Sequence, residues 1–339
     1  MPFVSVVTGC YNEEENVPEL YARVCDVFAK QLPDYTFEFI FIDNASSDAT
    51  VAVLKEIART DRRVKIIVNN RNFGALRSGH HALLQTRGEA VVALASDLED
   101  PPELIPDFLK KWEEGYKIVL AQKRSSEEFP AFSLMRSFYY SVATRLSETP
   151  LVKHVTGFGA YDRSVIEDLR SIDDPYPYLR GLVCELGYKQ YLVPFDKPVR
   201  RRGITKSNFY TLYDYGMLGI TSHSKVPLRI ATFAGFCLAF ASFLIALGYL
   251  LYKLVFWNQF QVGMAPVVIG IFFFASVQLF FIGILGEYIG SIHTQVLKRP
   301  LVTERERVNF DNPPIAAGRG SDAASPSQRS GRAMTIEPD

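Results

Sequence analysis

The sequence predicts an α/β domain built on a mostly parallel sheet, followed by a two-helix transmembrane hairpin. In the N-terminal part, short β-branched runs alternate with segments whose apolar residues recur at helical spacing, and each run ends in polar residues. Farther along, residues 230–252 and 262–285 form two apolar stretches without a charged side chain. Each is longer than the roughly 20 residues that cross a bilayer core, so both are predicted to span a membrane.

Composition limits the classes of function. A chain of 339 residues with 48% hydrophobic residues can hold one large domain besides two spans. Its net charge of zero gives no support to nucleic-acid binding, and we expect no nucleic-acid partner. The four cysteines form no C-x-x-C pair, which suits a reducing compartment rather than a disulfide scaffold.

Basic residues flank the two apolar stretches unevenly. Lys225 and Arg229 precede the first stretch, Lys298 and Arg299 follow the second, and Lys253 alone lies between them. Because positively charged flanks remain on the cytoplasmic side, both ends of the hairpin are predicted to be cytoplasmic. We therefore expect a multi-pass protein of the inner (plasma) membrane whose large N-terminal domain faces the cytoplasm.

The predicted elements follow in order. Strands are expected at residues 4–7, 37–42, 64–68 and 90–95, and helices beginning near residues 17, 51 and 75 follow the first three strands. A fifth strand at 118–122 precedes an aromatic amphipathic helix at 134–146, a helix that ends near residue 169 and a short strand at 188–193. In an open α/β sheet, ligands bind outside the carboxyl ends of such strands.

These elements divide the chain into six parts. We expect a catalytic-type domain at 1–207, a juxtamembrane interfacial helix at 208–226, membrane helices at 227–256 and 262–290, a cytosolic segment at 291–310 and a disordered tail at 311–339. An ordinary core helix is the alternative for 208–226. The alternating charges of the 291–310 segment suggest that it folds back on the cytosolic domain.

An acidic loop follows the fourth strand. The segment Leu94-Ala-Ser-Asp-Leu-Glu-Asp-Pro-Pro-Glu103 places three carboxylates directly after an apolar run. Closely spaced carboxylates at the carboxyl end of a strand suit Mg²⁺ or Mn²⁺ holding a diphosphate, whereas a solvated acidic turn is the alternative. The strand ends carry no G-x-G-x-x-G or G-x-x-x-x-G-K-[ST] motif, so phosphate would be held by metal and basic side chains.

Taken together, the motifs resemble those of family 2 glycosyltransferases with the GT-A (Rossmann-like) fold. The resemblance is to the membrane-bound polyprenyl-phosphate glycosyltransferases, similar to dolichyl-phosphate mannose synthase and bactoprenol glucosyltransferases, and it spans residues 3–310. The segments that carry it are Tyr11-Asn-Glu-Glu-Glu-Asn16, Asp43 with Ser46 and Asp48, Arg71-Asn-Phe-Gly74, Asp97-Leu-Glu-Asp-Pro-Pro-Glu103, Arg180-Gly181 and Arg200-x-x-Gly-x-Thr-Lys206.

The resemblance implies a set of site residues. Nucleotide contacts would come from Thr8, Tyr11, Glu13, Asp43, Ser96 and Asp97, and metal ligands would be Asp97 and Glu99. The catalytic set would be Asp97, Asp100, Arg124 and Asp162. Two features depart from the family pattern. Ala95 replaces the first aspartate of the usual acidic motif, and the region around Gly157 lacks an acidic residue found in many relatives.

Basic side chains are expected to hold the phosphates. We assign Arg124, Arg136, Arg200, Arg202, Thr205 and Lys206 to the acceptor phosphate and the donor diphosphate, because guanidinium and ammonium groups match phosphate oxygens. The alternative for residues 200–202 is binding of anionic lipid headgroups. Both roles are compatible.

The resemblance implies an inverting enzyme that moves one sugar from a nucleotide sugar to the phosphate of a polyprenyl lipid. A UDP-sugar such as UDP-glucose is the expected donor, undecaprenyl phosphate the expected acceptor, and a homo-oligomer, possibly a tetramer, the expected assembly. A processive polysaccharide synthase is disfavoured because two spans leave no room for a pore. The non-enzymatic alternative is a degraded transferase that serves as a membrane scaffold or regulator, suggested by Ala95 and by the missing acidic residue near Gly157.

Overall fold

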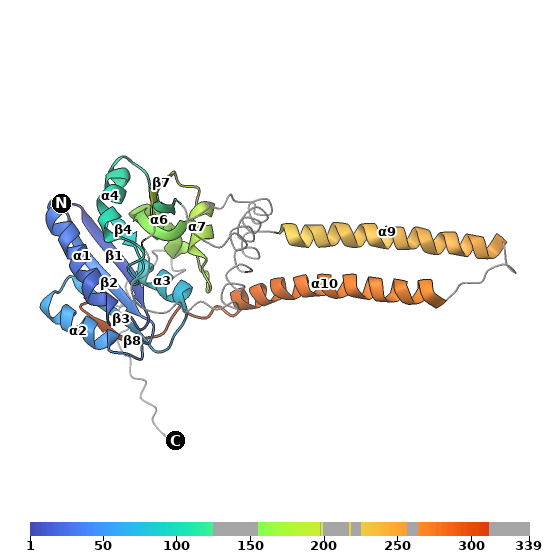
Figure 1. The fold of residues 1–339 in the computed structure, drawn as a ribbon, viewed down its shortest axis with the longest axis horizontal. Coiled ribbons are helices and arrows are strands. Elements are labelled where there is room, and N and C mark those ends of the chain that lie inside the picture. Colours follow the sequence, from blue (N-terminus) through green and yellow to red (C-terminus); the bar gives the residue numbers. More distant parts are fainter. Residues whose placement is uncertain (125–154, 197, 199–216, 218–224, 256–263, 312–339) are drawn as a thin grey trace, which may run out of the picture.

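A computed structural model describes residues 1–124, 155–196, 198, 217, 225–255 and 264–311. It consists of an α/β domain and two long apolar helices that extend from it (Figure 1). The predicted fold class is confirmed. The residues outside these ranges include Arg136, Arg200, Arg202, Thr205 and Lys206, the aromatic helix at 134–146 and most of the segments at 208–226 and 311–339, so those predictions lie outside the described residues.

One mixed sheet organises the domain. Within the described residues it has eight strands in the order β7-β5-β6-β4-β1-β2-β3-β8. The strands are β1 (Phe3–Cys10), β2 (Thr36–Asp43), β3 (Val64–Asn69), β4 (Ala90–Ala93), β5 (Ile118–Lys123), β6 (Val155–Asp162), β7 (Gln190–Phe195) and β8 (Glu304–Val308). The first four strands run parallel, as does the β5–β7 pair, whereas β6 and β8 run antiparallel to their neighbours.

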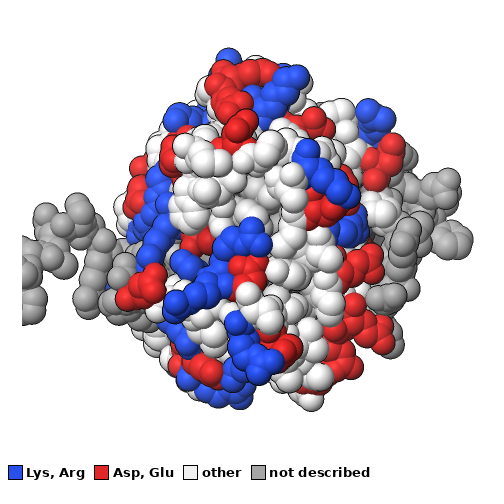
Figure 2. All heavy atoms as spheres, turned by 90° about the vertical axis from the view of Figure 1, so that its left-hand side faces the viewer, with Lys and Arg blue, Asp and Glu red and all other residues white. Residues whose placement is uncertain are grey.

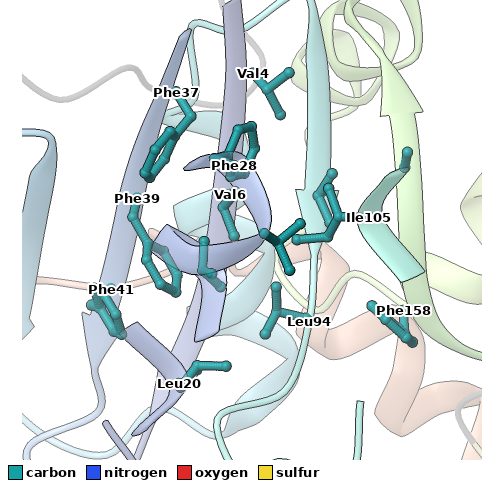
Figure 3. Packing of buried hydrophobic residues seen from close by; sticks show 14 of the residues in the cluster. Val4, Val6, Leu20, Phe28, Phe37, Phe39, Phe41, Leu94, Ile105 and Phe158 are labelled. Atoms are coloured by element: carbon teal, nitrogen blue, oxygen red, sulfur yellow. The ribbon is translucent and has the colours of Figure 1, made fainter. Parts of the chain in front are cut away.

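Helices cover both faces of the sheet. Helices α1 (Asn16–Gln31), α2 (Thr50–Thr60) and α4 (Ile105–Glu113) pack on one face, whereas α3 (Ala75–Leu84), α6 (Arg163–Ser171) and α7 (Leu179–Glu185) pack on the other. Since side chains alternate along a strand, β1 and β2 contribute to both layers. Figure 3 shows the first layer, in which Val4 and Val6 of β1 meet Phe39 of β2 and Leu20 of α1.

The two apolar helices lie side by side. Helix α9 (Val226–Val255) and helix α10 (Met264–Val296) contact each other (Figure 1). They expose large apolar side chains such as Phe233 and Phe272, each more than 70% accessible. Both helices are long enough and apolar enough to cross a membrane. Helix α10 continues to Val296, so the boundary predicted at residue 290 falls inside this helix.

The chain after α10 returns to the domain and adds β8 beside β3. Glu304 accepts from His81 Nε2 at 2.6 Å, Glu306 pairs with Lys55 at 2.7 Å, and the Asn309 amide donates to two backbone carbonyls. Burial acts to raise the pKa of Glu304, but hydrogen bonds from Arg307 and His81 hold it down at about 2. The C-terminal end of the hairpin is therefore tied to the sheet through β8.

The domain face that points away from the hairpin carries both signs of charge. Figure 2 shows Lys and Arg side chains interspersed with Asp and Glu across this face. Such a mixed surface is typical of a solvated face, and it offers no broad single-sign patch for a nucleic acid.

Candidate functional site

The candidate site lies at the carboxyl ends of the parallel strands β1 to β4. The register places Cys10 of β1 opposite Asp43 of β2, and Asp43 opposite Val68 of β3. The loops that follow these strands therefore begin side by side along one sheet edge. This is the edge at which open α/β sheets bind ligands.

Hydrogen bonds join the loop after β1 to the loop after β2. The Asn12 backbone N–H donates to Ser46 Oγ at 2.9 Å, and the Ser47 N–H donates back to Asn12 Oδ1 at 2.8 Å. The Glu13 N–H donates to Thr50 Oγ1 at 2.8 Å, while the Glu13 carboxylate accepts from Asn16. These contacts fix the backbone of the loop that carries Tyr11 and Glu13, two half-buried residues predicted to bind the nucleotide.

Asp43 and Thr8 present buried polar atoms that have no partner within the described part of the chain. Asp43 is fully buried, and its Oδ2 accepts from the Ser46 N–H at 3.0 Å, but its Oδ1 has no hydrogen bond. The Thr8 hydroxyl, also buried, has none either. A buried unsatisfied acceptor costs about 1–3 kcal/mol, so these atoms fit a ligand that donates to them.

The acidic loop is closed by its own hydrogen bonds. The Ala95 N–H donates to Asp100 Oδ2 at 3.0 Å, the Glu99 N–H donates to Asp97 Oδ1 at 3.1 Å, and Ser96 Oγ donates to the Gly9 carbonyl of β1 at 2.9 Å. Leu98 adopts a left-handed conformation with φ of 61°, which reverses the chain. The loop therefore holds Asp97 and Glu99 half-buried at the sheet edge while Asp100 lies beneath them.

The charge balance of this loop suits a divalent cation. Burial raises the pKa of Asp100 to about 6, and the carboxylates of Asp97 and Glu99 add to the rise, although the Ala95 N–H and Lys123 oppose it. In the described ranges no three His, Cys, Asp or Glu side chains gather to bind a metal by themselves. Mg²⁺ is often held by one or two carboxylates plus substrate phosphates, so Asp97 and Glu99 fit an ion that arrives with a diphosphate.

An amide network that the sequence analysis missed fixes the loop after β3. Asn44 Oδ1 accepts from Asn69 Nδ2, Ser78 Oγ and the Phe73 N–H, and Asn44 Nδ2 donates to Asn72 Oδ1 at 2.8 Å. The network joins the ends of β2 and β3 to α3. The sequence signal was the presence of asparagines after each of the first three strands, but their pairing depends on strand order and could not be predicted.

Asp162 does not belong to this site. Because β6 runs antiparallel to β4, the register pairs Asp162 with Ala90 at the opposite edge of the sheet. Its carboxylate caps α6 through Ser164 and accepts from Trp112 Nε1 at 2.7 Å and from Lys117 at 2.9 Å. Burial acts to raise its pKa, but these hydrogen bonds hold it at about 2. The structure therefore does not bring Asp162 to the other predicted catalytic residues, and the contacts of its carboxylate are those of a helix cap.

Two cations lie at the end of β5, where the strand reaches the site edge. Arg124 is exposed and lies 3.6 Å from Asp196, whereas the preceding Lys123 is close enough to lower the pKa of Asp100. Lys123, which was not in the predicted set, therefore lies close enough to the acidic loop to act on its charge.

The histidines and the cysteine beside the site are buried. His80 is 3% exposed, and burial lowers its pKa to about 4, whereas His81 pairs with Glu304. Cys10 is a packed thiol whose pKa is raised by burial.

Comparison with known proteins agrees with this architecture, and the chain belongs to glycosyl transferase family 2, whose model matches residues 5–170. It is 33% identical over 304 residues to an uncharacterised glycosyltransferase of Synechocystis, covering 88% of this chain and 93% of the relative. It is 32% identical over 299 residues to the SfII prophage-derived bactoprenol glucosyl transferase of Shigella flexneri, covering 88% and 96%.

Solved structures are similar at lower identity. Glucosyl-3-phosphoglycerate synthase from Mycobacterium tuberculosis, in complex with Mn²⁺, UDP and phosphoglyceric acid, matches with 20% identity and a TM-score of 0.45, covering 65% of this chain and 76% of that one.

Proposed function

We propose that this glycosyltransferase moves a single sugar from a UDP-sugar, such as UDP-glucose, to the phosphate of a polyprenyl lipid at the cytoplasmic face of the membrane. The observation that carries the proposal is the pairing of an acidic loop and buried unpartnered acceptors at one sheet edge with two apolar helices on the same chain. The name of the Shigella relative supports a bactoprenol acceptor.

The donor nucleotide is assigned to the loops after β1 and β2. The unpartnered Oδ1 of Asp43 would accept from the ring N–H of uracil, and the Thr8 hydroxyl lies on the same face of the neighbouring strand. The loop contacts described above already fix the backbone around Asn12 and Ser46. Such preorganisation lowers the cost of ordering the site when the nucleotide binds.

The leaving diphosphate is assigned to the acidic loop. Asp97 and Glu99 would hold Mg²⁺ or Mn²⁺, which when bound neutralises the charge that develops on the leaving group. Asp100 acts through the loop: its bond to the Ala95 N–H fixes the backbone that carries Asp97. Lys123 and Arg124 at the end of β5 add positive charge at the same edge.

The attacking group would be an oxygen of the acceptor phosphate. The second pKa of a phosphate monoester is about 6, so the acceptor is already largely a dianion near neutral pH and needs no strong base. Direct displacement inverts the anomeric centre. The protein then has to position the acceptor phosphate, and the hairpin, tied to the sheet through β8, would hold the site at a constant height above the bilayer.

A thermal-shift panel tests the donor assignment. The full-length protein in detergent is heated with UDP-glucose, UDP-galactose or GDP-mannose, each with Mn²⁺ or with a chelator. UDP-sugars with Mn²⁺ are expected to raise the midpoint of unfolding, because a ligand that binds only the native state stabilises it. The assignment fails when no UDP-sugar raises the midpoint, or when the chelator leaves the shift unchanged.

A further inference from the structure

Three arginines gather where the domain meets the foot of the hairpin. Arg71 follows β3, and Arg77 lies in the first turns of α3. Their guanidinium carbons lie 4.1 Å and 5.2 Å from the centre of the same Phe73 ring. Arg299 follows the end of α10 at Val296. We call Arg71, Arg77 and Arg299 the hairpin-foot cluster.

A direct contact ties this cluster to the hairpin. Arg77 Nη2 donates to the carbonyl of Pro300 at 2.6 Å, and Pro300 is the residue after Arg299. In Figure 1, α3 lies on the side of the domain nearest to the foot of α10. The cluster therefore lies next to the end of α10 that meets the domain.

Carboxylates at the hairpin foot pair with other side chains: Asp173 lies 4.0 Å from Lys298, and Asp174 accepts from the Gln295 amide at 2.8 Å. Burial and the nearby Arg71 and Arg299 lower the pKa of Arg77, with Tyr176 opposing them. Within the described ranges none of the three arginines forms an ion pair, and Arg77 Nε is buried without an acceptor. An anion with several oxygens would relieve the repulsion and accept from this buried N–H.

The position favours a lipid over the donor nucleotide. Helix α3 packs on the sheet face opposite to the one that carries Thr8 and Asp43. Arg299 lies three residues after the end of α10, so it lies at headgroup depth when α10 spans the bilayer. Guanidinium groups bind phosphates through paired N–H donors, and juxtamembrane basic residues bind anionic lipids.

We propose that the hairpin-foot cluster is a binding site for the phosphate headgroup of an anionic phospholipid. The proposal rests on the membrane location given under the proposed function, and it adds a site separate from those for the sugar donor and the lipid acceptor. The role of this site is to bind the α3 side of the domain to the surface of the bilayer.

Binding of a soluble headgroup probe tests the site. Full-length protein in detergent is titrated with dihexanoyl phosphatidylglycerol, and with dihexanoyl phosphatidylcholine as the net-neutral comparison, by microscale thermophoresis. Arg77→Gln and Arg299→Gln are each expected to weaken the phosphatidylglycerol affinity about five-fold, which corresponds to about 1 kcal/mol per cation. Arg62→Gln, an exposed arginine at the other end of β3, is the matched control and should change nothing.

Several outcomes would overturn the proposal. Unchanged phosphatidylglycerol affinity in the double variant R77Q/R299Q would do so, as would equal binding of the two lipids by the wild type. Displacement of the lipid by UDP would assign the cluster to the nucleotide instead. Because Arg299 is exposed, its variant remains informative when Arg77→Gln disturbs folding. UDP binding measured in the same samples separates failure of this site from failure of the proposed donor.

Discussion

Replacing Asp97 with asparagine is expected to lower the rate of sugar transfer about a thousand-fold, since it removes the main carboxylate assigned to the leaving diphosphate and its metal. Losses of this size correspond to about 4 kcal/mol of transition-state stabilisation. The loop itself should survive, because an asparagine oxygen can still accept from the Glu99 N–H. Steady-state transfer rates with saturating donor and Mn²⁺ measure the effect.

Asp162→Asn is the matched control for that experiment. Its pKa of about 2 lies below the ordinary value of 3.8, so the carboxylate contributes about 2 kcal/mol of stability above pH 4, and this contribution is lost as the pH falls toward 2. The variant should unfold more readily at neutral pH yet keep its turnover per folded molecule. Equal turnover in Asp97→Asn and wild type would contradict the site assignment.

Replacing Asp43 with asparagine is expected to weaken UDP binding 10- to 100-fold, by roughly 1.5–3 kcal/mol, the range for a hydrogen bond to a charged group. The asparagine oxygen can still accept from the Ser46 N–H, so the amide would present an N–H to the ring N–H of uracil. The fold should be retained, because Asp43 Oδ1 has no partner within the described residues. Calorimetric titration with UDP measures the loss.

The same variant makes a prediction about base specificity. Cytosine presents an acceptor where uracil presents its N–H, so Asp43→Asn should narrow the preference for UDP over CDP. Asp48→Asn is the matched control, since Asp48 lies in the same loop but bonds to Thr50. The assignment of Asp43 would be refuted by UDP and CDP affinities that stay at their wild-type values.

The parallel half of the sheet could be predicted because its strands are apolar and end in polar loops. The runs beginning at Val4, Phe37 and Val64 lie in observed strands, and the run beginning at Ala90 does so up to Ala93, two residues short of its predicted end. The residues after these strands meet at one edge. The positions of the acidic loop and of Asp43 could be predicted for the same reason. Parallel strands bring their carboxyl ends to one edge of the sheet, so this prediction needed no knowledge of tertiary contacts.

The antiparallel strands could not be predicted in this way. β6 contains Gly157 and Gly159 and lacks a clear alternation, and its direction decides that Asp162 lies at the far edge. β8 reads Glu-Arg-Glu-Arg-Val, which looks like a solvated segment, and it forms a strand because β3 offers an edge and Lys55 and His81 pair with its carboxylates. The amide network around Asn44 likewise depends on which strands are neighbours.

Transfer of labelled sugar into lipid tests the central claim most directly. Full-length protein in vesicles is incubated with radiolabelled UDP-glucose, undecaprenyl phosphate and Mn²⁺, and the organic extract is counted. The account predicts label in the organic phase that requires the lipid phosphate, is abolished by a chelator and is released as free sugar by mild acid. Label that never enters the organic phase with any of several UDP- and GDP-sugars would contradict the account.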